Sequence, residues 1–258
     1  MVWQPVSHLP TTTELPCSDD IPVDNEEQNL LPNLLLLTLA SLWADRLDWY
    51  FGVDMAIYHT TGGNPRVPVV PDAFLSLGVP RRKPSREGQG RLSYAVWEED
   101  GIVPILTLEM VSQTPGGEYD EKLEIYRRLG VLYYVLYNPL HWQRDRHQPF
   151  EVYKLVEGAY QLQIGEPYWM PEVELGIGRA RQLVGGIELE VLLWHDEQGQ
   201  LYPVPEEELR RLRAQTQQLQ QQVEAERQRA EVERQRAARL AEYLRSLGLD
   251  PDNLPNQQ

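Results

Sequence analysis

The sequence predicts a mixed α/β fold followed by one long C-terminal helix. A strand–helix–strand succession lies in the middle of the chain: Val103–Val111, Glu118–Leu129 and Leu132–Tyr137. Segments with strand character then flank turn residues such as Glu157–Gly158, which is typical of hairpins. From Pro205 onward the composition changes to Glu, Gln, Arg and Ala. A helix between strands, with hairpins outside it, indicates a mixed sheet with helices against it.

Composition limits the class of protein. The chain has 258 residues, 41% of them hydrophobic, which suffices for a core and excludes wholesale disorder. Its single cysteine, Cys17, excludes an internal disulfide framework and a thiolate cage for zinc. The apolar stretch Leu30–Ala44 is too short to span a bilayer and contains Pro32. We therefore expect a soluble, cytoplasmic protein with no membrane partner and no signal peptide.

The net charge of −15 is unevenly distributed. Residues 206–247 hold nine Arg and eight Glu, so that, with Asp250 and Asp252 counted, residues 1–205 carry −14. Phosphate binding depends on clustered Lys and Arg, so this charge argues against nonspecific attraction to nucleic acid. Any nucleic-acid function must therefore rely on a local site.

Four segments follow from these composition changes. They are an extended N-terminal arm (1–23), an α/β domain (24–205), a long helix (206–247) and a disordered tail (248–258).

The first helix of the domain has clear start signals. Asp24 and Asn25 are good N-caps, and the acids Glu26 and Glu27 suit a first turn. Leucines then recur at helical spacing up to Leu42. Because an interior proline removes a helix hydrogen bond, Pro32 predicts a later start or a kink.

Strands are predicted wherever apolar or β-branched runs lie between turn residues. The predicted strands are Trp49–Tyr58, Val67–Leu77, Val103–Val111, Leu132–Tyr137, Phe150–Val156, Tyr160–Ile164, Ile187–Trp194 and Gln200–Pro203. The last two would form a hairpin around Asp196–Gly199. Gly130 is a natural stop for the helix Glu118–Leu129.

Two carboxylates interrupt apolar strand sequence. Asp72 follows the apolar run Val67–Val70, and Glu109 lies near the end of the Val103–Val111 strand. A buried carboxylate is costly unless it is paired, protonated or bound to a cation. Two of them on neighbouring strands make an oxygen-rich site for Mg²⁺ or Mn²⁺. In the alternative, Asp72 caps a turn and Glu109 pairs with an arginine.

Lys122 lies on the helix that follows the Glu109 strand. From there it could enter the same site and stabilise charge on a phosphoryl transition state. The alternative is a surface lysine paired with Glu118, four residues earlier. Glu26 is a further candidate acid if the first helix packs over the site.

Other polar clusters indicate less. His141 and His147 lie in a polar loop around Asp145, with no recognised zinc spacing. The segment Pro80–Arg91 is the one concentrated basic patch. It is either a solvated loop or a clamp for a DNA backbone.

Several motifs, in order, resemble the Uma-two family of bacterial restriction-endonuclease-like proteins. They include Pro71-Asp72, the Glu-Met-Val-Ser at Glu109, the Tyr-Asp-Glu-Lys-Leu around Lys122, and Asn138-Pro139. Together with the later Glu151 hairpin, the resemblance covers residues 20–205. It implies the PD-(D/E)XK fold, with a central four-stranded mixed sheet between helices and a metal site at its edge.

The resemblance also implies roles for individual residues. Asp72 and Glu109 would bind Mg²⁺, with the backbone carbonyl of Met110, and Glu26 falls near the acid of the family's first helix. The superfamily's usual lysine two residues after the glutamate is replaced by Val111, so Lys122 would supply that charge. The implied function is a metal-dependent endonuclease that hydrolyses phosphodiester bonds in DNA. The alternative is an inactive assembly or regulatory protein that acts through its C-terminal helix.

The long helix predicts a homodimer. Positions three and four residues apart from Leu209 to Leu247 form an imperfect coiled-coil seam, apolar at both ends, with Glu226 and Glu233 in its middle. The alternatives are a coiled coil with another partner and a helix that folds back onto its own domain.

Overall fold

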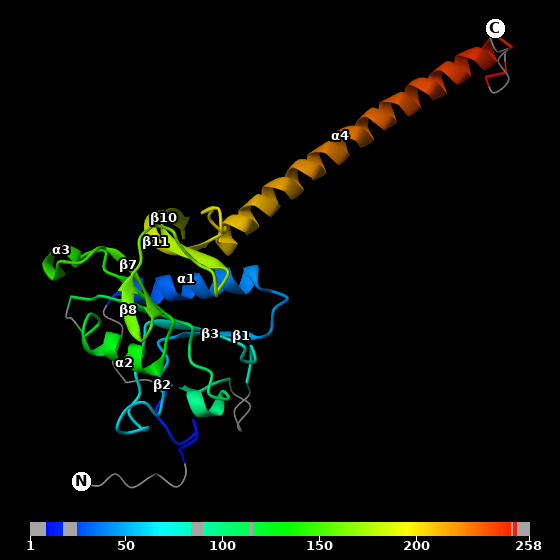
Figure 1. Ribbon diagram of the computed structural model, residues 1–258. Coiled ribbons are helices and arrows are strands. Elements are labelled where there is room, and N and C mark those ends of the chain that lie inside the picture. The colour runs from blue at the N-terminus through cyan, green and yellow to red at the C-terminus, as the bar shows by residue number, and fades with distance from the viewer. Residues whose placement is uncertain (1–8, 18–24, 84–89, 114–115, 249, 252–258) are drawn as a thin grey trace. The chain divides into compact units, whose positions relative to one another are not determined.

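The computed structural model describes residues 9–17, 25–83, 90–113, 116–248 and 250–251. These belong to two units that divide after Pro205. We call the first unit the body (Figure 1). The predicted cap Asp24, much of the N-terminal arm and most of the C-terminal tail lie outside the described residues.

The first helix, α1 (Glu26–Leu42), begins where its cap predicts. The side chain of Asn25 accepts hydrogen bonds from the backbone N–H groups of Glu27 and Gln28. Pro32 lies inside the helix, so the later start that it suggested is wrong. Leu31, Leu35 and other leucines of one face are buried, and this burial stabilises the helix despite the lost hydrogen bond.

A six-stranded mixed sheet forms the centre of the body. Its strand order is β1-β3-β5-β6-β7-β8. The bounds are β1 (Trp49–Val53), β3 (Ala73–Leu77), β5 (Leu106–Met110), β6 (Tyr133–Tyr137), β7 (Phe150–Val156) and β8 (Ala159–Leu162). Only β5 and β6 pair in parallel, and α2 (Glu121–Leu129) connects them. The sheet therefore has two strands more than the family resemblance implies, because β1 and β8 extend its edges.

Smaller elements surround this sheet. A second sheet has the order β11-β10-β9, and β2 pairs with β4 in parallel. Their bounds are β2 (Ile57–Tyr58), β4 (Tyr94–Ala95), β9 (Tyr168–Met170), β10 (Leu175–Val184) and β11 (Ile187–His195), with a 3-10 turn at Val96–Glu98 and the short α3 at Trp142–Asp145. The predicted mixed α/β class with a long C-terminal helix is confirmed.

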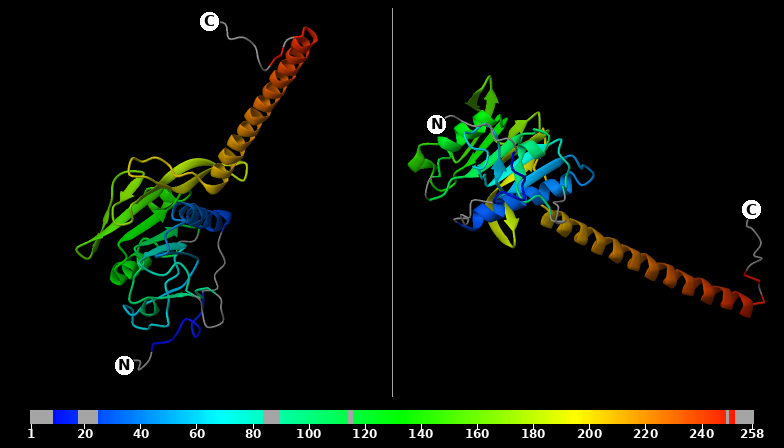
Figure 2. Two further views of the ribbon diagram at one scale, coloured as in Figure 1. Left: turned by 90° about the vertical axis from the view of Figure 1, so that its right-hand side faces the viewer. Right: turned by 90° about the horizontal axis from the view of Figure 1, so that it is seen from below.

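The two faces of the central sheet have different coverings. On one face, α1 lies between the central sheet and β10–β11 (Figures 1 and 2), and Trp194 Nε1 donates to the carbonyl of Leu35. On the other face, α2 packs its Tyr126 and Leu129 against Tyr134 of β6. Successive residues of a strand point to opposite faces, so Leu108 and Met110 join the α1 side and Glu109 faces α2.

Several strand predictions need correction. The run Trp49–Tyr58 splits into β1 and β2 at Asp54, which has a positive φ of 48°. In Val67–Leu77, only the second half is strand, so Asp72 directly precedes β3. The partner of β11 is β10, and Gln200–Pro203 contributes only a bridge between His195 and Leu201. The sequence analysis did not predict β10, because polar and charged residues on its exposed half interrupt the apolar pattern of a strand.

Two other predicted features hold. The turn Glu157–Gly158 connects β7 to β8. Gly130 ends α2 in the left-handed conformation, with φ of 90°, which a side chain would make unfavourable.

The described part of the N-terminal arm, residues 9–17, contacts the body. Leu15 is buried beside Tyr58 and Ala95, and the Tyr58 hydroxyl donates to the carbonyl of Pro16. Trp97 Nε1 donates to the carbonyl of Pro10. This part of the arm is therefore integrated in the body's packing.

The long helix α4 (Pro205–Ser246) has no buried residue, and all of it after Pro205 belongs to the second unit. Proline suits the first position of a helix because its missing N–H would have no partner there. Across the described ranges, no helix is both long and apolar enough to cross a membrane.

Candidate functional site

The α2 face of the central sheet brings Asp72 and Glu109 together. Ala73 of β3 pairs with Leu108 of β5, and extending this antiparallel register by one residue places Asp72 opposite Glu109. Asp72 Oδ2 accepts a hydrogen bond of 2.6 Å from the backbone N–H of Met110. Main-chain pairing therefore holds both carboxylates at the same edge.

Glu109 is held by two side chains from α2. Its Oε2 lies 2.8 Å from Lys122 Nζ, and its Oε1 accepts a hydrogen bond of 2.6 Å from the Tyr126 hydroxyl. Lys122 and Tyr126 are one helical turn apart and so share a face. Lys122 Nζ also donates to the carbonyl of Val70, 3.2 Å away. The structure thus pairs Lys122 with Glu109, and the alternative pairing with Glu118 is wrong.

Burial determines the electrostatics of this group. Glu109 is 1% exposed, and burial raises its pKa to about 8, helped by the Asp72 carboxylate and opposed by Lys122. Burial also raises the pKa of Asp72 to about 6, while the Met110 N–H opposes the rise. Burial lowers the pKa of Lys122, but Glu109 and Asp72 together leave it above its usual value. Two carboxylates thus share one ammonium group.

The first helix reaches this group through Gln28. Its Nε2 donates to the Met110 carbonyl over 3.4 Å, whereas the side chain of Glu26 is exposed in the first turn of α1. The Met110 carbonyl therefore lies at the site with a polar side chain on it. A role for Glu26 stays a prediction.

Two residues near the site escaped the sequence analysis. Glu118 was considered only as the alternative partner of a surface Lys122, but it is 5% exposed and accepts from the backbone N–H of Gly116 at 2.8 and 3.0 Å. Its carboxylate also raises the pKa values of Asp72 and Lys122. Tyr126 was not among the predicted site residues. Its position four residues after Lys122, on the same face of the helix, could have indicated that it lies at the site.

The oxygen ligands suit a divalent cation, although they are few. Asp72, Glu109 and the Met110 carbonyl supply hard oxygen donors, and a cation would offset the cost of burying both carboxylates. In the described part of the chain, no group of three or more His, Cys, Asp or Glu side chains could hold a metal ion. Any site here must therefore include backbone, water or substrate oxygens.

The histidine loop has a packing role. The His147 ring stacks on Tyr119, with centroids 3.7 Å apart, and its Nδ1 lies 3.2 Å from the Glu151 carboxylate. Asp145 bonds Asn138 and Arg144. These contacts use the polar atoms in local packing.

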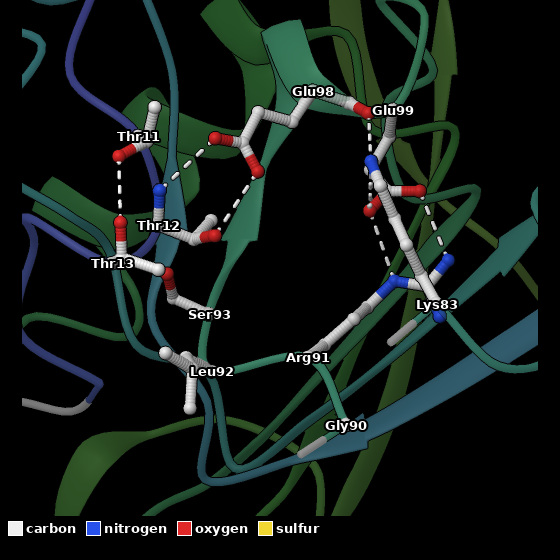
Figure 3. A pocket seen from close by; sticks show the side chains of 10 residues that line it. All are labelled: Thr11, Thr12, Thr13, Lys83, Gly90, Arg91, Leu92, Ser93, Glu98 and Glu99. Carbon is white, nitrogen blue, oxygen red and sulfur yellow. Dashed lines mark hydrogen bonds and ion pairs between the residues drawn. The ribbon is translucent and has the colours of Figure 1, made fainter. Parts of the chain in front are cut away.

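The basic patch is only partly solvated. The side chain of Arg91 is 2% exposed, and its Nε and Nη2 each lie 2.9 Å from the Glu99 carboxylate (Figure 3). Lys83 donates to the Glu98 carbonyl and lies 3.3 Å from Glu99 Oε1. The solvated-loop interpretation is therefore wrong for Arg91. Residues 84–89, with Arg86, lie outside the described residues.

These side chains line a small cavity. It has a volume of about 180 Å³ and lies between the described arm residues Thr11–Thr13 and the Arg91–Glu99 pair (Figure 3). Thr12 closes one side by donating from its backbone N–H and its hydroxyl to Glu98. The charged side chains that line the cavity are therefore paired: Arg91 and Lys83 with Glu99, and Glu98 with Thr12.

The sequence of the body matches a known protein family. A family model named Uma2 and described as "Putative restriction endonuclease" matches residues 20–184, more than half of the chain. No curated protein matches. A crystal structure of a "putative nuclease belonging to DUF820" from Anabaena variabilis is similar, with a TM-score of 0.41 and 12% identity over 58% of this chain and 74% of that chain.

Proposed function

Because the chain belongs to the Uma2 family of restriction-endonuclease-like proteins, as Pro71-Asp72 and Glu109 led us to expect, we propose that it is a metal-dependent endonuclease that hydrolyses phosphodiester bonds in DNA. We further propose that it acts as a homodimer. One observation supports the nuclease function most. The carboxylates of Asp72 and Glu109 lie buried between α2 and the central sheet, and Lys122 of α2 contacts Glu109 there.

Asp72, Glu109 and the Met110 carbonyl would hold Mg²⁺ or Mn²⁺. Such an ion polarises a phosphate oxygen and lowers the pKa of bound water. The protein prepares the ligands before the ion arrives, since the Met110 N–H orients Asp72 and the Tyr126 hydroxyl orients Glu109. Ligands that are already oriented lose little entropy on binding.

Lys122 would stabilise the charge of the transition state. Its side chain is 25% exposed, whereas Glu109 beside it is 1% exposed, so a phosphate in solvent can approach the ammonium group. Its raised pKa keeps that group protonated at neutral pH. A fixed positive charge where negative charge develops lowers the activation barrier.

The alternative is an inactive assembly or regulatory protein with the same fold. Its support is the acidic body, because a charge of −14 repels nucleic acid. The buried Arg91 strengthens this alternative, since it removes one cation of the basic patch from any DNA-facing surface.

Plasmid nicking with Mg²⁺ tests the nuclease directly. We expect Asp72→Ala, Glu109→Ala and Lys122→Ala each to reduce the rate by about 100-fold or more, the usual effect of removing one such stabilising group. Glu124→Ala is the matched control, because Glu124 is an acid of α2 that pairs with Arg127 and Arg128 outside the site. It should keep the activity of the unmodified protein.

Calorimetric titration of the same proteins with Mg²⁺ separates the two functions. The nuclease is supported if the unmodified protein binds Mg²⁺ and nicks plasmid, and if Asp72→Ala abolishes the binding of Mg²⁺. Neither binding nor nicking in the unmodified protein supports the assembly protein. Nicking that survives all three site substitutions would refute the assignment of the site.

A further inference from the structure

The helix α4 has a row of exposed aliphatic side chains towards each of its two ends. Leu212, Leu219 and Leu240 are 53, 54 and 59% exposed, and Leu209, Val223 and Leu247 are similar. All six occupy positions of the seam that alternates steps of three and four residues from Leu209 to Leu247, which places them on one side of the helix. Leucines in such a row are typical of a helix that buries this side against a partner.

This row is symmetric about Gln228. Leu209 and Leu247 lie equally far from Gln228 on its two sides, and the same holds for Leu212 and Leu244. Further in, the positions that correspond about Gln228 are Thr216 and Leu240, Leu219 and Ala237, and Val223 and Glu233, so that each aliphatic side chain there corresponds to a small or polar one. In an antiparallel pair centred on Gln228, each seam position faces the corresponding position of the other copy, so the leucines at one end of a helix meet leucines at the opposite end of its partner.

From this pattern we infer that α4 pairs with α4 of a second copy as an antiparallel coiled coil centred on Gln228. In this register Leu209 meets Leu247 and Leu212 meets Leu244, at both ends of the pair. Other antiparallel registers leave leucines at one end of each helix without a partner. The full overlap therefore buries the most apolar surface.

The acids of the seam select the direction. In a parallel pair in register, Glu226 faces Glu226 and Glu233 faces Glu233 of the second copy, and like charges in contact destabilise a coiled coil. In the antiparallel pair, Glu226 faces Ala230 and Glu233 faces Val223. Arg229 flanks Ala230 and lies within reach of the opposite Glu226.

The length of the row identifies the partner. The seam extends from Leu209 to Leu247, about 57 Å at 1.5 Å per residue. In the described part of the chain the next longest helix is α1, with 17 residues against 42 in α4. A second α4 is thus the described element that matches the row in length and in symmetry.

If the protein is the proposed nuclease, this pairing also sets the distance between the points at which its two bodies join the coiled coil. The body joins α4 at its N-terminal end, so the two Pro205 junctions lie about 70 Å apart in the antiparallel pair. The antiparallel pairing therefore separates the two points at which the bodies are attached.

Spin-label distances in the full-length protein test the pairing. Cys17→Ser removes the single cysteine, and a label is then attached at Gln228→Cys or Ala214→Cys. Both positions point away from the seam. In the antiparallel pair the labels at 228 lie roughly 25 Å apart, the width of two helices, and those at 214 lie about 45–50 Å apart.

Each other outcome overturns the inference. Two distances near 25 Å indicate a parallel pair, and the absence of dipolar coupling at micromolar concentration indicates a monomer or a helix folded onto its own body. The distances do not depend on hydrolysis. A failed nicking experiment therefore refutes the nuclease without affecting the pairing, and the reverse also holds.

Discussion

Glu99 and Glu109 are both buried and both paired with cations, yet their surroundings differ. Glu99 is 5% exposed and receives two hydrogen bonds of 2.9 Å from the Arg91 guanidinium, with Lys83 at 3.3 Å. The Arg91 guanidinium also lies over the Tyr50 ring, 4.4 Å from its centre. Glu99 thus has more positive than negative charge around it, in a planar geometry that matches its carboxylate.

Glu109 has less compensation. One ammonium group and one phenol contact it, and the Asp72 carboxylate is close enough to raise its pKa further. The comparison shows that the charge of Glu99 is compensated by its neighbours, whereas the two carboxylates at Glu109 have one ammonium group between them. Glu99 joins two segments of the body, whereas Glu109 and Asp72 still need a proton or a cation.

The largest expected difference between the Arg91–Glu99 and Lys122–Glu109 pairs is in the free energy of unfolding that is lost when the cation is removed. Arg91→Met should cost about 3 kcal/mol of unfolding free energy, near the lower end for breaking a buried pair because Lys83 remains. Lys122→Met should cost about 1 kcal/mol, since Glu109 can take up a proton instead. Urea unfolding at pH 7 measures both. Equal losses would contradict the comparison.

The second prediction concerns pH and the Glu109 pair. The folded pKa of Glu109, about 8, exceeds the unfolded value of about 4.5, so the folded state binds the extra proton between these values. Stability should therefore fall as the pH rises from 6.5 to 8, by at most about 1.4 kcal/mol per pH unit, and should level off above pH 8.

Glu109→Gln removes the titrating group and should flatten this slope. Glu124→Gln, on the exposed side of α2, is the control and should keep it. The range above pH 6.5 avoids Asp72, whose pKa is about 6. A slope that persists in Glu109→Gln would show that another group causes it.

The smallest expected effect belongs to Tyr126. Tyr126→Phe removes the hydroxyl that donates to Glu109 Oε1 and should cost about 1 kcal/mol at pH 7. It should also raise the Glu109 pKa, because the charged carboxylate loses a donor, and so extend the pH-dependent range upward.

Tyr134→Phe is the matched control for this change. The Tyr134 hydroxyl also lies on the α2 face, but it donates to the backbone carbonyl of Glu118 over 2.6 Å. Its removal should cost a similar free energy and leave the pH-dependent range unchanged. If both variants move that range equally, the Tyr126 bond has no specific effect on Glu109.

Local signals in the sequence predicted much of this body. Asn25 and Gly130 define helix ends through bonds and dihedral angles of neighbouring residues, so their effect is visible in a short segment. The β5 strand is buried on both faces and reads as an apolar run. By contrast, β10 escaped prediction, because half of it is exposed and its partner β11 is decided by pairing across a turn.

The same division applies to the candidate site. Residue type and spacing along the chain sufficed to identify Asp72 and Glu109 as costly carboxylates next to or within apolar strand sequence, and to place Lys122 on the following helix. The bond from Lys122 to Glu109, the burial of Glu118 and the pairing of Arg91 with Glu99 depend on the folded arrangement. Burial and charge pairing depend on which segments meet in space, and each charged group has several partners within reach along the chain.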